Sequence, residues 1–302
     1  MDHKLYLRDK GIYKLNGCFY FHKNNKIVTN NEILNKLVVP PAWRSVWYAS
    51  DPKCHIQVSG IDAGGKKQYI LSEKWIKNSK FQKFARMKKF IKDLGLFKRK
   101  IQLTLNLLTR ENIIHLLFNL LIDLHIRVGN EIYAENNQTY GLTTLRQSHL
   151  TLVLNSFQLK FVGKSNISHC INIPPKYNDF FHLLKSTKKN KNLFVYNGKP
   201  ITSEELNDYL KKFMGKEYTC KDFRTYSANM LFIKSFLKNS KKVLNPKKCV
   251  LMSIDEAAQH LGHTRSISRK SYISESLIDY CIYSFSDATT LGEASLLSKV
   301  WS

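Results

Sequence analysis

The sequence predicts an α+β protein, in which a small antiparallel β domain precedes a larger, mainly α-helical domain that contains a short β-hairpin sheet. Before about residue 75, short β-favouring runs alternate with Gly, Pro and Asn-Gly turn signals. After it, apolar residues recur at helical spacing. At 302 residues with 43% hydrophobic content, the chain is long enough for two domains, which we expect at 1–75 and 76–302.

The first domain is predicted to consist of short antiparallel strands. Proline and glycine pairs, such as Pro40-Pro41 and Gly64-Gly65, separate its β-favouring runs. These runs are Gly11–His22, which turns at Asn16-Gly17, Ser45–Ala49, His55–Ser59 and Gln68–Leu71.

Helices dominate the second domain. Between Trp75 and Leu94, apolar residues lie at helical spacing with lysines and arginines between them. Ile113–Ile126 is a nearly continuous apolar run, whose length and leucine content favour a buried helix over a strand. A three-stranded sheet is predicted at 149–154, 157–162 and 167–172, with turns at Asn155-Ser156 and Gly163–Asn166, so Lys164 should lie on a hairpin tip.

Two capping boxes mark helix starts further along. Thr202-x-x-Glu205 and Ser253-x-x-Glu256 each offer a hydroxyl and a carboxylate to unpaired backbone donors. The second box predicts a short helix that ends at Leu261, with Gly262 as its C′ residue. His263 would then follow directly after a helix end.

The charge of the chain indicates a polyanionic partner. There are 48 Lys and Arg against 23 Asp and Glu, a formal charge of +25, which favours nucleic acid. The alternative is a lysine-rich protein from an AT-rich genome. The basic residues are spread along the chain, which argues against an anionic membrane surface. Six scattered cysteines without metal-binding spacing, and a start without an apolar run, predict an intracellular protein with reduced thiols.

Five residues of the types that cut and reseal a phosphodiester through a tyrosine occur in order: Arg127, Lys164, Arg224, His263 and Tyr272. Guanidinium and imidazolium groups can meet the charge that develops on the phosphate oxygens. A lysine close to other cations can protonate the leaving 5′-oxygen. The tyrosine hydroxyl can form a covalent intermediate that conserves the energy of the cleaved bond, so that resealing needs no ATP.

Each of these residues also has an ordinary alternative. Most basic residues are solvated surface charges, and most of the 15 tyrosines should pack. His260, on the predicted helix before His263, is expected to be a surface or packing residue. Gly163-Lys164-Ser165 imitates the end of a Walker A loop, but Gln158 stands where that loop needs glycine, which excludes nucleotide binding there.

In these motifs the chain resembles the small, poxvirus-like type IB DNA topoisomerases of poxviruses, giant DNA viruses and some bacteria. A poxvirus or giant-virus member is expected. The resemblance covers about Val38 to Ile273. The segments that carry it are Val39–Trp47, Gly60–Tyr69, Ile126–Glu131, Tyr140–Leu145, Phe161–Lys164, Lys221–Asn229 and Gly262–Tyr272.

The resemblance implies a monomeric enzyme that clamps double-stranded DNA between its two domains and relaxes supercoils without ATP, metal or another cofactor. Tyr272 would form a 3′-phosphotyrosyl link, with Lys164 as general acid for the 5′-oxygen. Arg127, Arg224 and His263 would stabilise the transition state. Residues implied to contact DNA or to support the Arg224 side of the site are Lys67, Gln68, Tyr69, Lys221 and Asn229. The protein would be DNA-associated inside the cell, or in the virion if its source is a virus.

One departure affects target choice. Where the family often has a second aromatic residue two positions after the tyrosine at 69, this chain has Leu71. Any inherited preference for a pyrimidine-rich target is therefore in doubt.

Two other functions remain open. A tyrosine recombinase uses the same five residue types in the same order, but recombinases tend to have histidine three residues before the second arginine, where this chain has Lys221. A non-catalytic basic DNA-binding protein would explain the charge but not the ordered set.

Overall fold

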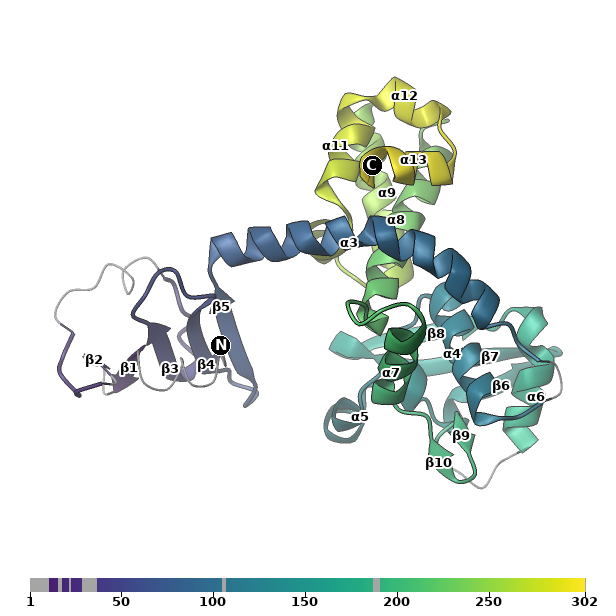
Figure 1. Cartoon of the computed structure of the whole chain (residues 1–302), viewed down its shortest axis with the longest axis horizontal. Coiled ribbons are helices and arrows are strands. Elements are labelled where there is room, and N and C mark those ends of the chain that lie inside the picture. The colour runs from purple at the N-terminus through teal and green to yellow at the C-terminus, as the bar shows by residue number, and fades with distance from the viewer. Residues whose placement is uncertain are drawn as a thin grey trace. The chain divides into compact units, whose positions relative to one another are not determined.

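The computed structural model describes residues 11–15, 18–21, 23–28, 37–104, 107–186 and 191–301. The chain divides into two compact units, Met1–Lys83 and Phe84–Ser302, and the division falls inside helix α3 (Glu73–Lys100). The sequence predicts it at residue 75, near the start of this helix. Figure 1 shows the helices and strands of each unit. No helix of the described ranges is long and apolar enough to cross a membrane.

The first unit contains the predicted small antiparallel sheet. Its strands lie in the order β2-β1-β3-β4-β5, and every neighbouring pair is antiparallel. The predicted turn at Asn16-Gly17, and His22, lie outside the described residues. The strands are β1 (Gly11–Leu15), β2 (Cys18–Phe21), β3 (Arg44–Ala49), β4 (Ile56–Ile61) and β5 (Lys67–Leu71).

One face of this sheet carries the apolar core of the unit. Ile12, Val46, Tyr48 and Val58 are buried there, and alternate residues of β3 point to this face because side chains alternate along a strand. A register shift between Arg44 and Trp47, with Ser45 at φ 49°, forms a bulge at the beginning of β3.

The second unit has two apolar cores, and helix α8 (Cys220–Asn239) runs through both. Phe223 belongs to the first core, whereas Ala228, Phe232 and Phe236 belong to the second. The first core also receives residues from α3, α4 (Arg110–Leu124), α6 (Asn178–Ser186), α7 (Ser203–Phe213) and the sheet of β6 (Leu150–Val153), β7 (Ser156–Gly163) and β8 (Ile167–Asn172). The short hairpin of β9 (Val195–Tyr196) and β10 (Lys199–Pro200) follows α6 in sequence.

The second core is formed by helices that follow α8 in sequence, and they gather around it in Figure 1. Leu296 and Leu297 of the last helix are buried in it, so the end of the chain packs back onto its own α8. The helices are α9 (Pro246–Leu261), α11 (Glu275–Tyr283), α12 (Phe285–Thr290) and α13 (Glu293–Trp301).

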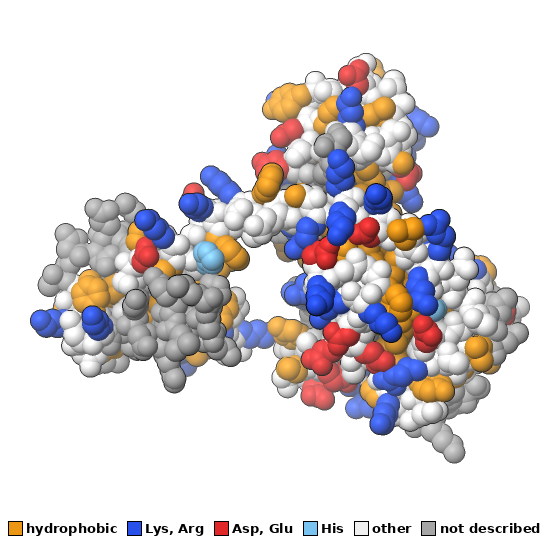
Figure 2. All heavy atoms as spheres, viewed as in Figure 1, with side chains coloured by type: hydrophobic (Ala, Val, Ile, Leu, Met, Phe, Trp, Pro, Cys, Tyr) orange, Lys and Arg blue, Asp and Glu red, His pale blue; other side chains and the backbone are white. Residues whose placement is uncertain are grey.

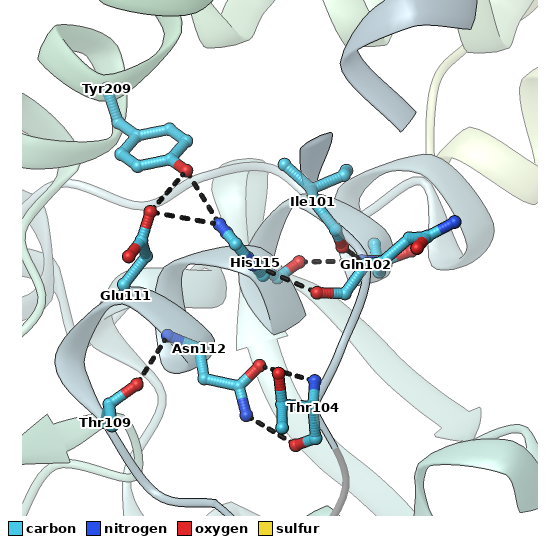
Figure 3. A network of polar contacts seen from close by, with 9 residues as sticks. Ile101, Gln102, Thr104, Thr109, Glu111, Asn112, His115 and Tyr209 are labelled. Carbon is cyan, nitrogen blue, oxygen red and sulfur yellow. Dashed lines mark hydrogen bonds and ion pairs between the residues drawn. The ribbon is translucent and has the colours of Figure 1, made fainter. Parts of the chain in front are cut away.

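A polar network fixes helix α4, which leads to Arg127. Thr109 caps the helix by accepting from the backbone N–H of Asn112, and the Asn112 amide bonds the backbone of Thr104 and Leu107. His115 contacts the carbonyl of Gln102 and the hydroxyl of Tyr209, and that hydroxyl also bonds Glu111 (Figure 3). These bonds attach the segment before α4 and helix α7 to one helix face.

Two local predictions are wrong. Val153 pairs with Ser156, so the first hairpin turns at Leu154-Asn155, one residue before the predicted Asn155-Ser156. Both turn residues have positive φ, 44° and 63°, which suits the twist of a two-residue hairpin and puts Asn155 at the second position.

The second error concerns the box at Ser253. This serine is buried inside α9, which begins at Pro246, seven residues after α8 ends at Asn239, and has Asn245 as its N-cap. The Ser253 hydroxyl donates to the carbonyl of Cys249 at 2.8 Å instead of capping a helix. The box at Thr202 is a true helix start, since its hydroxyl accepts from the N–H of Glu205.

Candidate active site

Arg224 lies on α8 between the two cores of the second unit and is only 8% exposed. Its guanidinium donates to the carbonyl of His125, just after α4, and to that of Leu261, at the end of α9. Burial, with the nearby charge of Arg127, lowers the pKa of Arg224 to about 9. Its Nε has no hydrogen-bond partner among the described residues. Arg224 therefore holds two helix ends together and keeps one buried donor unused.

His263 follows Gly262, which ends α9 in the left-handed conformation at φ 57°, as predicted. Its Nε2 lies 3.1 Å from Nη2 of Arg224, and its Nδ1 lies 3.3 Å from the hydroxyl of buried Ser268. Arginine can only donate, so Nε2 accepts and the ring proton is on Nδ1. Burial, with the charges of Arg224, Arg127 and Lys164, lowers the pKa of His263 to about 3. The imidazole is thus neutral in the DNA-free protein.

Tyr272 ends a π-helical turn, Ser268–Tyr272, and its ring stacks on that of His263 with centroids 4.4 Å apart. Thr264 begins the preceding short helix α10 (Arg265–Ile267) by accepting from the N–H of Ile267. The five residues of this turn and the three of α10 bring the phenol back over the imidazole. Sequence spacing alone indicates two to three turns but not this return.

Asn229 fixes the backbone around Tyr272. Its amide donates to the Tyr272 carbonyl at 2.9 Å and to the Thr225 carbonyl at 2.7 Å, and its oxygen accepts from the N–H of Ser274 at 2.9 Å. Asn229 is 0% exposed. Its amide is buried and bonded to backbone groups in the DNA-free protein, so we expect it to act on the site by positioning the tyrosine segment rather than by a direct DNA contact.

Arg127 is half-buried in the loop between α4 and α5 (Glu131–Asn137). Its carbonyl accepts from the N–H of Leu142, and Gly129 at φ 107° lets the loop approach Gly141 closely. Burial lowers the pKa of Arg127, whereas the nearby Tyr272 acts in the opposite direction. The loop thus brings a second guanidinium to the side of Arg224 and Tyr272.

Lys164 is the first residue of the turn between β7 and β8, as the sequence predicts. Gly163 pairs with Ile167, and Ser165 and Asn166 adopt left-handed φ angles of 64° and 60°. The side chain is exposed, and its charge contributes to the lowered pKa of His263. Lys164, Arg127 and Arg224 line one pocket.

Two histidines of this pocket are missed by sequence reasoning. His125 caps α4 in the left-handed conformation, its Nδ1 lies 2.9 Å from the Ser227 hydroxyl, and burial lowers its pKa to about 4. His169 lies on β8, where burial and the charges of Arg127 and Arg224 lower its pKa. The position of His125, two residues before Arg127, is a signal in the sequence. Nothing in the local sequence indicates that either imidazole ring is buried. The pocket is also lined by His260.

Of the remaining predicted DNA contacts, Lys67, Tyr69 and Lys221 are exposed and Gln68 is half-buried. Lys67 and Tyr69 are on one face of β5, with the ammonium 5.7 Å from the ring centroid, and Tyr69 is 47% exposed. Gln68 points to the other face, where its amide donates to Asp62 at 2.7 Å. Lys221 is exposed in the first turn of α8. Within the described ranges, no group of three or more His, Cys, Asp and Glu residues could hold a metal ion.

An arginine, a histidine and a tyrosine in contact, with a second arginine and an exposed lysine nearby, are typical of enzymes that break and rejoin DNA strands through a tyrosine. Residues 72–281 match the family described as "Eukaryotic DNA topoisomerase I, catalytic core", and residues 17–62 match "Bacterial DNA topoisomerase IB, N-terminal domain". The chain belongs to the type IB DNA topoisomerase family.

Viral relatives match most of the chain. It is 33% identical over 292 residues to DNA topoisomerase 1B of Acanthamoeba polyphaga mimivirus, covering 87% of this chain and 85% of the relative. It is 26% identical over 285 residues to DNA topoisomerase I of Monkeypox virus, covering 86% and 88%. Among solved structures, XerH site-specific recombinase bound to palindromic difH substrate matches with a TM-score of 0.36 and 16% identity, covering 71% of this chain and 52% of that chain.

Proposed function

We propose that this type IB topoisomerase relaxes supercoiled duplex DNA by using Tyr272 as the nucleophile, with Arg127, Lys164, Arg224 and His263 as its catalytic partners and without ATP or metal. One observation carries the proposal. Nη2 of Arg224 lies 3.1 Å from Nε2 of His263, whose ring stacks on Tyr272 at 4.4 Å. A guanidinium, an imidazole and a phenol from distant segments thus form one contiguous surface.

The phosphate is received by donors that are already fixed. The phosphate would meet the guanidinium of Arg127 and that of Arg224, whose buried Nε has no partner among the described residues in the DNA-free protein. Arg224 also occupies Nε2 of His263 in the DNA-free protein. A bound phosphate competes for that guanidinium, and its negative charge favours protonation of the ring. Nε2–H of His263 can then donate to the phosphate, while Nδ1–H keeps its hydrogen bond to the Ser268 hydroxyl.

Strand cleavage then follows as a balanced exchange. The phenol of Tyr272 gives its proton to water, its oxygen bonds to phosphorus, and the bond from phosphorus to the 5′-oxygen breaks. Lys164 gives a proton to the departing 5′-oxygen. The strand keeps a 3′-phosphate linked to Tyr272, and the free 5′-hydroxyl can attack it in reverse. One phosphodiester is exchanged for another, so resealing needs no ATP.

The first unit is proposed to form one half of a DNA clamp, and the second unit the other half. Fifteen Lys and Arg residues against six Asp and Glu lie in 1–83, and thirty-three against seventeen lie in 84–302. Basic side chains are spread over the visible face of the second unit in Figure 2. The residues of β5 that would contact the duplex are Lys67, Gln68 and Tyr69. To read a base, the amide of Gln68 must give up its hydrogen bond to Asp62 and bond the base edge instead. Lys221 would contact a phosphate.

The enzyme is proposed to act as a monomer. Helix α13 follows Tyr272 and buries Leu296 and Leu297 in the second core of the same chain. That core also holds Ala228 on the helix that bears Arg224 and Asn229. The segment that carries the nucleophile is thereby held in its own subunit, and no second copy is needed to complete the site.

Plasmid relaxation tests the proposal. Purified protein is incubated with supercoiled plasmid in EDTA without ATP, beside the Tyr272→Phe variant. The wild type should yield a ladder of relaxed topoisomers, and the variant should bind DNA without relaxing it. Activity that needs a divalent metal or ATP, or that survives in Tyr272→Phe, would overturn the proposal. Exchange of DNA segments between plasmids without relaxation would indicate a recombinase.

A further inference from the structure

His169 lies beside the candidate catalytic residues, and no step of the proposed mechanism uses it. It is the third residue of β8 and pairs across the hairpin with Phe161 of β7. The two rings stack with centroids 4.9 Å apart and planes 20° from parallel. The imidazole is half-buried, and neither ring nitrogen has a hydrogen-bond partner within the part of the chain that the structure describes.

The edge of this ring faces two glycines that are far apart in sequence. A methyl group at Gly163 would lie 2.7 Å from Nε2 of His169 and 2.8 Å from its Cδ2. A methyl group at Gly262 would lie 3.2 Å from its Cε1. Neither glycine has a side chain that could keep the ring away. His169 thus lies between the end of β7 and the end of α9, beside Ile167, whose Cγ2 would lie 3.4 Å from the same methyl group at Gly262.

Each glycine directly precedes a candidate catalytic residue. Gly163 is followed by Lys164, and Gly262 is followed by His263. The Lys164 turn contains two left-handed residues and is exposed, so its own bonds constrain it weakly. Helix α9, in contrast, ends in a core and is bonded to Arg224 through Leu261. Contact through His169 therefore ties the weakly held end of β7 to a firmly held helix end.

We propose that His169 is a positioning residue for Lys164, which it holds at the distance from the His263 turn that proton transfer to the leaving 5′-oxygen requires. This inference rests on the proposed role of Lys164 as general acid. A neutral aromatic side chain suits the position, because a further cation would repel Arg127, Arg224 and Lys164. The lowered pKa of His169, caused by burial and by the two arginines, agrees with an uncharged ring.

The test compares single-turnover cleavage of two DNA substrates, one with the ordinary 5′-oxygen and one with sulfur at that bridging position. Sulfur leaves without protonation, so it bypasses a misplaced acid. His169→Ala should cleave the ordinary substrate on the order of one-hundredfold more slowly, as expected for displacement of a reacting group by about 1 Å. The sulfur substrate should restore most of this loss, and DNA affinity should be unchanged. His169→Phe, which keeps a flat ring, should stay close to wild type.

A second pair of variants probes the contact itself. Gly163→Ala should slow the ordinary reaction because its methyl group pushes on the imidazole. In the His169→Ala background the same change should cost little, since the ring is gone. His182→Ala is the matched control, because it removes a histidine packed against Phe157 on the same strand β7. It should cleave both substrates as the wild type does.

The outcomes separate this inference from the function beneath it. Rescue of Lys164→Ala by sulfur without rescue of His169→Ala would overturn the positioning role and leave the general acid intact. Failure of sulfur to rescue Lys164→Ala would overturn the general acid itself. Equal loss in His169→Phe and His169→Ala, or additive effects of Gly163→Ala and His169→Ala, would also contradict the proposal.

Discussion

The side-chain amide of Asn229 donates to the backbone carbonyl of Tyr272 at 2.9 Å, while its oxygen accepts from the N–H of Ser274. One buried residue of α8 thus bonds the chain on both sides of Ile273. Because Arg224 lies five residues earlier on the same helix, the proposed nucleophile and a proposed phosphate ligand share one rigid support.

Asn229→Ala should therefore impair both stability and cleavage. The change leaves a buried carbonyl and a buried N–H without partners, which should lower the free energy of unfolding by at least about 2 kcal/mol. Cleavage by the folded fraction should slow at least tenfold with little change in DNA affinity, since the tyrosine backbone is released. Urea unfolding and single-turnover cleavage at low temperature measure the two effects.

Asn239→Ala is the control for this variant. Asn239 is also buried on α8 but bonds Ser253 and Glu256, away from the tyrosine. It should lose stability while its folded fraction cleaves normally. Equal cleavage defects in the two variants would mean that Asn229 has no particular role in positioning Tyr272.

The pH dependence of stability should report the buried His125. Its folded pKa of about 4 lies below the ordinary 6.5, so the unfolded chain binds the proton first as pH falls. The contribution of the neutral His125 ring to the free energy of unfolding is fully present above pH 6.5. It is lost as pH falls towards 4, and the loss is up to about 3 kcal/mol. His125→Gln should flatten the fall in unfolding free energy between pH 7 and pH 5, measured with urea. An unchanged slope, equal to that of the exposed control His182→Gln, would contradict the burial of a neutral ring.

Lys164→Ala should lower the rate of cleavage by roughly two to four orders of magnitude, the usual contribution of a general acid. A 5′-bridging sulfur should restore most of the rate, because its departure needs little protonation. Single-turnover cleavage of the two substrates checks this. If the variant is equally slow on both, Lys164 positions DNA and another residue is the acid.

Much of this arrangement follows from local sequence. The Lys164 turn is marked by Gly163 and Asn166, the long apolar run before Arg127 predicts α4, and Gly262 predicts the helix end before His263. The box at Ser253 misleads because the same residue pattern also arises inside a helix, where the hydroxyl bonds the preceding turn.

Contacts between distant segments could not be predicted in this way. The burial of Asn229 depends on residues 272–274, and His169 meets Gly262 only because the hairpin packs near the end of α9. Neither contact leaves a pattern in the residues near it. The sequence therefore predicts which residue types serve the site, and the structure adds the side chains that hold them.

Salt dependence should reveal which lysines meet DNA phosphates. Each phosphate contact contributes about 0.9 to the slope of log K against log salt on duplex DNA. Lys67→Ala and Lys221→Ala should each flatten that slope by about this amount in binding titrations. Lys176→Ala is the control, because its ammonium is already paired with Asp123 at 2.6 Å. If the slope of log K against log salt for Lys67→Ala equals that of the wild type, Lys67 does not contact a phosphate, which would contradict a role for β5 in the proposed clamp.

The most direct test of the central claim is to identify the covalent DNA adduct. The protein is trapped on a duplex whose cleaved strand cannot be resealed and is digested with trypsin. The nucleotide-linked peptide is then fragmented in a mass spectrometer. The expected peptide, Ser271–Lys299, also contains Tyr280 and Tyr283, so fragmentation must assign the site. We predict a 3′-phosphate on Tyr272 and no adduct with Tyr272→Phe. A link at another tyrosine, a link through a 5′-phosphate, or an adduct that persists in Tyr272→Phe would contradict the mechanism.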